Sequence, residues 1–139
     1  MKRRDFLMTA AAGFGALSMP RLALAAQDYT PGLVQKHLDA GDTVFLDFKA
    51  DWCGTCKAQE RVLNSLKSEN GAYEKNITFI NVDWDTYGDA DLSKSLKIPR
   101  RSTLVVLQGD KELGRIVAGT SKEQIKELMD TALKAAMAT

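Results

Sequence analysis

Cys53 and Cys56 are the two cysteines of this 139-residue chain, and they stand three positions apart. A structural disulfide usually closes a longer loop, because the conformational entropy that it removes from the unfolded chain grows with loop length. A Cys-x-x-Cys pair gains little in that way and is typical of thiols that exchange disulfides. Zinc ligands share this spacing, but a zinc site needs about four ligands, and the one histidine, His37, lies far from the pair in the sequence. The pair therefore predicts redox chemistry without a metal and without a cofactor.

The cysteines stand between a predicted strand and a predicted helix. Residues 43–48 form a nearly continuous apolar run, which is typical of a strand buried on both faces. Residues 58–67 carry an apolar stripe at helical spacing. A thiol at the N-terminus of a helix ionises readily, because the unpaired N–H groups and the helix dipole favour an anion there. Cys53 is therefore the predicted nucleophile, and Cys56, one turn further on, is predicted to be more buried.

The remaining segments complete an α/β pattern. They are a helix at 29–40 that starts with Thr30-Pro31, a second buried strand at 77–82, a weaker helix at 87–96, hairpin strands at 103–107 and 112–118, and a final helix capped by residues 120–123. The order helix, strand, helix, strand, helix, hairpin, helix predicts a central mixed sheet with parallel core strands and a C-terminal antiparallel hairpin.

Residues 47–57, with the sequence DFKADWCGTCK, resemble the active-site strand and turn of the thioredoxins. The likeness runs from about residue 33 to about residue 133, nearly the whole of the chain after its first 25 residues. The letters ADWCxxCK are especially similar to periplasmic reductases, such as the C-terminal domain of the transmembrane disulfide-bond reductase. This resemblance implies a thioredoxin-like three-layer sandwich and a thiol–disulfide oxidoreductase.

The resemblance also implies roles for the residues nearest the cysteines. Cys53 would attack a substrate disulfide, and Cys56 would resolve the mixed disulfide that results. Asp47 matches the buried carboxylate of the family, which accepts a proton and so activates the second cysteine. Phe79 stands where the family often places a lysine on the next strand.

Three further residues of the motif would form part of the substrate groove. Trp52 would shield the thiols and offer partners a flat apolar platform, unless it simply packs in the core. Gly54 and Thr55 are closer to the Gly-Pro pair of reducing thioredoxins than to the Pro-His pair of strong oxidants. The motif therefore favours reduction.

The family faces its cysteines with a cis-proline, and this chain departs from that pattern. An alignment without gaps on residues 103–107 puts Ser102 in the place of the proline, whereas Pro99 lies three residues earlier. We expect Ser102 to take the position; the alternative is a loop rebuilt around Pro99. Arg101 would then line the groove and form a positive rim with Arg100, unless both arginines are merely solvated.

Residues 1–25 are typical of an export signal peptide. Basic residues at 2–4 precede a short apolar stretch at 6–17, and the segment ends in Ala-Leu-Ala, a small-x-small cleavage site. Residues 3–7, RRDFL, also resemble the twin-arginine motif that directs folded proteins to export. A plain secretory signal or an uncleaved anchor is the alternative. We expect a periplasmic protein whose thioredoxin-like domain spans 26–139.

Composition limits the classes of partner. The chain is 45% hydrophobic and 27% charged, as in an ordinary globular domain. Without residues 1–25, 15 basic and 17 acidic side chains remain, so the sequence gives no sign of nucleic-acid binding. The expected partners are disulfide-containing periplasmic proteins and a membrane thiol that donates electrons, and we expect a monomer.

Three functions use the same two cysteines. The favoured one is reduction of periplasmic disulfides, and the second is the reverse activity of an oxidase or isomerase. The third is a metal or iron–sulfur carrier, because loss of the proline opposite the thiols would open them to a metal. The acidic segment 83–91 imitates part of a calcium loop, but Tyr87 and Lys94 occupy two ligand positions, and a solvated loop is predicted instead.

Overall fold

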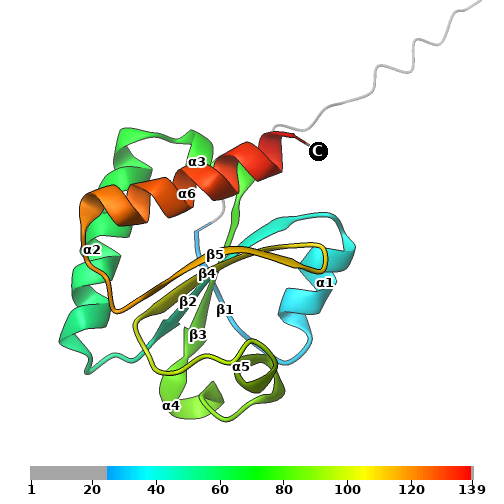
Figure 1. Ribbon diagram of the computed structural model, residues 1–139, viewed down its shortest axis with the longest axis vertical. Coiled ribbons are helices and arrows are strands. Elements are labelled where there is room, and N and C mark those ends of the chain that lie inside the picture. The colour runs from blue at the N-terminus through cyan, green and yellow to red at the C-terminus, as the bar shows by residue number, and fades with distance from the viewer. Residues whose placement is uncertain (1–24, 139) are drawn as a thin grey trace, which may run out of the picture.

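The computed structural model describes residues 25–138, so the predicted signal peptide, its cleavage site and its twin-arginine motif lie outside the described residues except for Ala25. The strands are β1 (Gln27–Asp28), β2 (Thr43–Lys49), β3 (Thr78–Asp83), β4 (Thr103–Gln108) and β5 (Lys111–Val117). The helices are α1 (Leu33–Asp39), α2 (Gly54–Glu69), α3 (Ala72–Asn76), α4 (Trp84–Tyr87), α5 (Asp91–Ser95) and α6 (Lys122–Met137) (Figure 1). In the part of the chain that the structure describes, no helix is long and apolar enough to span a membrane.

The five strands form one mixed sheet in the order β1-β3-β2-β4-β5. The first three of that order are parallel, and β4 pairs antiparallel with both β2 and β5. The predicted mixed sheet with a C-terminal hairpin is thus confirmed. Strand β2 lies at the centre, and its first six residues are buried, as the continuous apolar run predicted. The residues that follow β2 are therefore held by the buried central strand of the sheet.

Helices cover both faces of the sheet, which gives the predicted three layers (Figure 1). Successive side chains of a strand point to opposite faces. Phe45 of β2 packs with α2, α3 and α6 on one face, and Leu46 packs with α1, α4 and α5 on the other. Asp47 has the same parity as Phe45, so its carboxyl group points to the α2 side.

Helix α1 begins at Leu33, later than the sequence predicted. Gly32 stands before it with a φ of 88°, a left-handed conformation that glycine adopts without strain. The Tyr29 N–H donates to the Asn81 carbonyl at 2.8 Å, which extends the edge pairing of β1. The predicted start at Thr30-Pro31 is wrong, because these residues carry the chain from the sheet edge to the helix.

The segment predicted as one helix at 87–96 contains only the short helix α5, and α4, which the sequence did not predict, ends at Tyr87. Gly88 closes α4 by donating its N–H to the Trp84 carbonyl at 2.9 Å. Ala90 is extended, with φ −70° and ψ 160°, and it precedes the first residue of α5. The sequence did not predict β1 or α3, because two and five residues are too few to show a hydrophobic period.

Candidate active site

Cys53 is the N-cap residue of α2. Its backbone is extended, with φ −87° and ψ 114°, and its Sγ accepts a hydrogen bond from the Cys56 N–H at 3.2 Å. A tight turn joins β2 to this helix, and the Cys53 N–H donates to the Ala50 carbonyl at 3.1 Å. Gly54 is exposed and Thr55 is half-buried in the first turn of the helix. The central strand thus delivers the Cys53 sulfur to the N-terminus of a 16-residue helix.

Both cysteines are free thiols and both are buried. Cys53 is 2% exposed and Cys56 is 1% exposed, so the nucleophile is covered almost as fully as its partner. Burial opposes ionisation of Cys53, but interactions with the Cys56 thiol, the Ser102 hydroxyl, the Cys56 N–H and Arg101 outweigh it. Together they lower the pKa of Cys53 to about 6. Burial and the hydrogen bond with Cys53 raise the pKa of Cys56. The site therefore holds one readily ionised sulfur and one that keeps its proton.

Ser102 lies opposite the two sulfurs. Its Oγ is 3.2 Å from the Cys53 Sγ and 3.0 Å from the Cys56 Sγ, within hydrogen-bond distance of both. Its side chain has no exposed surface, whereas Pro99 is exposed. In residues 25–138 no peptide bond is cis, and Ser102 reaches the thiols with a φ of 62°.

Hydrogen bonds fix the Ser102 backbone on both sides. Its N–H donates to the Phe48 carbonyl at 2.7 Å, and its carbonyl accepts from the Ala118 N–H at 2.8 Å. The Gln59 Nε2 donates to the same carbonyl at 3.0 Å and to the Gly119 carbonyl at 2.9 Å. Gln59 is fully buried in α2 and was missed by the sequence analysis. Its signal was a polar side chain on the buried stripe that starts at Cys56.

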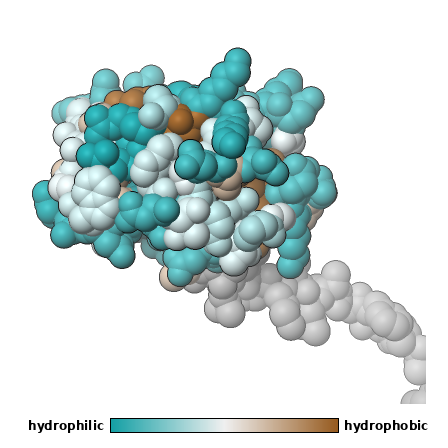
Figure 2. Space-filling view, turned by 90° about the horizontal axis from the view of Figure 1, so that it is seen from below, coloured by the Kyte–Doolittle hydropathy of each residue, from teal (hydrophilic) through white to brown (hydrophobic). Residues whose placement is uncertain are grey.

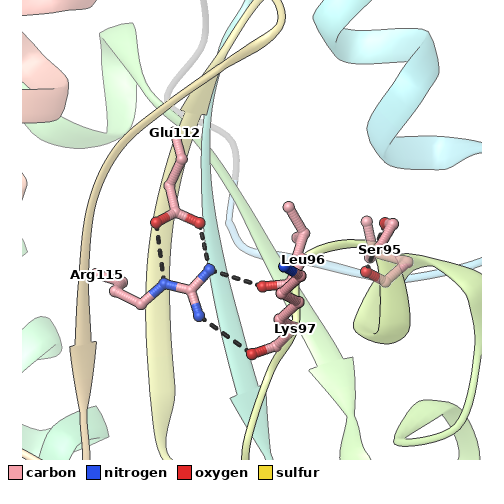
Figure 3. Close-up of polar contacts among 6 residues, drawn as sticks. Ser95, Leu96, Lys97, Glu112 and Arg115 are labelled. Carbon is pink, nitrogen blue, oxygen red and sulfur yellow. Dashed lines mark hydrogen bonds and ion pairs between the residues drawn. The ribbon is translucent and has the colours of Figure 1, made fainter.

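Arg115 of β5 holds the loop that leads from α5 toward Ser102. Its Nη2 donates to the Leu96 carbonyl at 2.7 Å, and its Nη1 donates to the Lys97 carbonyl at 3.3 Å. Two nitrogens of the guanidinium also bind both carboxylate oxygens of Glu112 (Figure 3). This arginine was likewise not identified from the sequence, because its partners lie 18 and 19 residues away.

Trp52 and Arg101 cover the outer side of the site. Trp52 is 60% exposed, so the alternative that it packs in the core is wrong. Its Nε1 donates to the two carboxylate oxygens of Asp85 at 3.1 and 3.0 Å. The Arg101 Cζ lies 4.3 Å from the centre of the Trp52 ring, a cation–π geometry. Arg101 is half-buried against this ring and is not merely solvated.

Asp47 is buried beneath α2, with 5% of its surface exposed. Among the described residues its Oδ1 has no hydrogen-bond partner. Burial raises the pKa of Asp47 to about 7, with Lys49 and Lys67 opposing the rise and Glu60 adding to it. The Lys67 Nζ lies 4.0 Å from the centre of the Phe79 ring. Lys49 of β2 and Lys67 of α2 thus supply positive charge near Asp47, although Phe79 itself carries none.

His37 and the acidic segment 83–91, to which the sequence analysis gave no catalytic role, make structural contacts. His37 pairs with Asp42 at 2.8 Å. In the acidic segment, Asp83 caps α4 by accepting from the Asp85 N–H at 3.3 Å. Within residues 25–138, no group of three or more His, Cys, Asp or Glu side chains is placed to hold a metal ion.

A cysteine pair at the start of a helix that follows the central strand of such a sheet is the active-site arrangement of a thiol–disulfide oxidoreductase. The family model for thioredoxin matches residues 21–131. The chain belongs to the thioredoxin family, and it is a thiol–disulfide oxidoreductase.

Plant thioredoxins and a bacterial structure illustrate the relationship. The chain is 30% identical over 95 residues to thioredoxin H2-1 of Oryza sativa subsp. japonica, a match that covers 68% of this chain and 64% of that protein. It is 30% identical over 94 residues to an H-type thioredoxin of Fagopyrum esculentum, covering 68% and 76% of the two chains. The crystal structure of Trxlp from Edwardsiella tarda superposes with a TM-score of 0.66 at 26% identity, covering 76% of this chain and 98% of that one.

Proposed function

We propose that this protein is an exported disulfide reductase in which Cys53 attacks the substrate and Cys56 resolves the intermediate. The observation that carries the proposal is the contrast between the two sulfurs. The Cys53 Sγ accepts the Cys56 N–H at 3.2 Å at the N-terminus of α2, and its pKa is lowered to about 6. The pKa of Cys56 is raised by burial. Because the thiolate is the nucleophile, Cys53 is the sulfur that reacts first near neutral pH.

The reaction follows in two displacements. The Cys53 thiolate bonds to one sulfur of the substrate disulfide, and the other substrate sulfur leaves as a thiolate and takes a proton from solvent. Cys56 then loses its proton and attacks the Cys53 Sγ, and the second substrate sulfur leaves. The substrate gains two electrons, and the enzyme ends as the Cys53–Cys56 disulfide. Asp47, with a pKa of about 7, is partly ionised near neutral pH and is the proposed acceptor of the Cys56 proton.

The cysteines lie at the N-terminus of α2, toward the end of the molecule that carries α4 and α5 (Figure 1). Figure 2 shows the molecule from that end, with a mostly hydrophilic surface and apolar colour confined to separate spots. Trp52, 60% exposed beside Cys53, is the proposed apolar platform for the substrate. Arg101 lies over its ring and gives the platform a positive edge, which favours substrates with acidic residues near their disulfides.

The proposed direction and compartment rest on the sequence. The Gly54-Thr55 pair between the cysteines resembles that of reducing family members, and residues 1–25 resemble a cleaved export signal. A reductase outside the cytoplasm needs a supply of electrons. We propose a membrane thiol as the donor and disulfide-containing periplasmic proteins as the acceptors, with the enzyme acting as a monomer.

Export is tested by the fate of the N-terminus. The mature protein is expected to begin at Ala26, within one or two residues, and to be recovered from the periplasm. The double substitution Arg3→Lys and Arg4→Lys is expected to block export by the twin-arginine route. Cell fractionation and N-terminal mass spectrometry measure both results. Normal export of the double variant would contradict the route, and an intact N-terminus would contradict cleavage.

The same cells test whether Cys53 is the sulfur that bonds to substrates. A Cys56→Ser variant is expected to be recovered from the periplasm with substrate proteins attached through Cys53, because the resolving sulfur is missing. A variant that carries both Cys53→Ser and Cys56→Ser is the matched control, and it should capture none. Equal capture by the control would contradict the proposed reaction.

A further inference from the structure

We propose that Ser102 is a catalytic residue whose one hydroxyl proton serves the two cysteines in turn. It is donated to the Cys53 thiolate in the reduced enzyme, and to the Cys56 thiolate while Cys53 is bound to substrate. The inference rests on the proposed order in which the two sulfurs react. It gives the residue that replaces the cis-proline a chemical role that a proline cannot fill.

The position of the hydroxyl carries the first step. The Ser102 Oγ lies 3.2 Å from one sulfur and 3.0 Å from the other, and it has no exposed surface. A serine hydroxyl has one proton to donate and can accept through its oxygen. Hydrogen bonds to ionised acceptors are stronger than those to neutral ones. In the reduced enzyme the hydroxyl therefore donates to the Cys53 thiolate and accepts from the Cys56 thiol.

Substrate attack changes which sulfur carries the charge. Once Cys53 is part of a mixed disulfide its sulfur is neutral, and neutral sulfur is a weak acceptor. Cys56 becomes the charged acceptor when it ionises, and it lies 3.0 Å from the same oxygen. Rotation about the Cβ–Oγ bond of Ser102 is enough to redirect the proton. One buried hydroxyl can thus stabilise the nucleophile of each step without movement of the backbone.

The backbone holds the hydroxyl at this point. Ser102 has a φ of 62°, a conformation that strains residues other than glycine. Its N–H binds the Phe48 carbonyl, and its carbonyl accepts from Ala118 and Gln59. Because glycine adopts this φ freely, Ser102→Gly removes the hydroxyl and is expected to leave the loop in place.

Other groups also face the sulfurs, and the variant leaves them unchanged. Arg101 and the Cys56 N–H favour the Cys53 thiolate, and Asp47 lies beneath the pair with a carboxyl group that disfavours it. A change in the pKa of Cys53 or in the reduction potential of Ser102→Gly is therefore measured with the same surrounding charges in place.

The experiment compares Ser102→Gly with the unmodified protein. Loss of one hydrogen bond to an ionised sulfur is expected to lower the ionisation constant of Cys53 about tenfold. Thiolate absorbance or the rate of alkylation, recorded against pH, measures this change. The equilibrium with glutathione is expected to shift about tenfold toward the disulfide form, which corresponds to about 30 mV. Resolution of the Cys53 mixed disulfide is expected to slow about threefold near neutral pH, because less Cys56 is ionised although each thiolate is more nucleophilic.

Ser93→Ala is the matched control. Ser93 is 2% exposed, and its hydroxyl donates to the Tyr87 carbonyl at 2.7 Å, so the variant removes another buried hydroxyl and is expected to shift none of the three quantities. Ser102→Ala provides a second test with a methyl group in place of the hydroxymethyl. Ser102 variants with native circular dichroism, a reactive Cys53 and an unchanged pKa and potential would overturn the role of Ser102. Faster alkylation of Cys56 than of Cys53 in the unmodified protein would instead overturn the proposed function.

Discussion

Replacement of Cys53 by serine is expected to reduce the turnover of insulin disulfides to the uncatalysed rate. The nucleophile of the first displacement is then missing, and the Cys56 thiol cannot replace it, because Cys56 is buried and burial raises the pKa of its thiol. Cys56→Ser is expected to lose turnover as well, but for another reason. It keeps the first attack and accumulates a mixed disulfide, which mass spectrometry detects as a mass increase on Cys53.

The two serine variants therefore control for each other. Both remove one sulfur from the same buried site, yet only Cys56→Ser should form an adduct with a small disulfide. Alkylation rates in the unmodified protein provide a second measurement of the same assignment. An adduct that forms on Cys56 in Cys53→Ser, at the rate seen for Cys53 in Cys56→Ser, would contradict the assigned roles.

The Asp47→Asn variant is expected to be more stable than the unmodified protein by about 4 kcal/mol at about pH 8, and equally stable at about pH 4. The carboxyl has a pKa of about 7 in the folded protein, raised by burial. Its value in the unfolded chain is about 3.9. Between these values the folded state binds more protons than the unfolded state, so stability falls as pH rises. Asparagine has no charge to bury and is free of this loss.

Urea unfolding of the reduced proteins at the two pH values measures this difference. Both proteins contain the same cysteines, so thiol titration largely cancels in the comparison. Asp89→Asn removes an exposed carboxylate and is the control, with the same stability change expected at both pH values. A gain in stability for Asp47→Asn that does not depend on pH would show that ionisation of Asp47 is not the cause.

In activity assays Asp47→Asn is expected to resolve mixed disulfides more slowly, because a neutral amide accepts no proton.

The parts of the fold that the sequence predicted correctly have strong local patterns. The buried strand β2, the turn at Cys53 and helix α2 follow one another, and each has its own signal in composition or period. The hairpin of β4 and β5 is marked by Gly109 and Asp110, and Ser121 caps α6 by accepting the Gln124 N–H. These features depend on residues close together in the chain.

Several contacts that complete the site are not local. The resemblance to thioredoxins predicted Ser102 opposite Cys53 and Cys56, which lie 49 and 46 positions away in the chain, but it did not predict the backbone hydrogen bonds that hold the serine there. Gln59 binds a carbonyl 60 residues away. The near-complete burial of Cys53 likewise depends on the whole surrounding structure. Such positions are set by packing and hydrogen bonding between elements, which no single segment encodes.

The reduction potential of the Cys53–Cys56 couple tests the reductase assignment most directly. Stabilisation of the Cys53 thiolate favours the dithiol form and makes the couple more oxidising, whereas the Gly54 and Asp47 environment resembles that of reducing family members. Equilibration of the purified protein with glutathione buffers, followed by thiol quantification, measures the balance. We expect a potential between about −270 and −180 mV, the range from thioredoxin to protein disulfide isomerase. A value near −120 mV, typical of a strong oxidase, would contradict the proposed function.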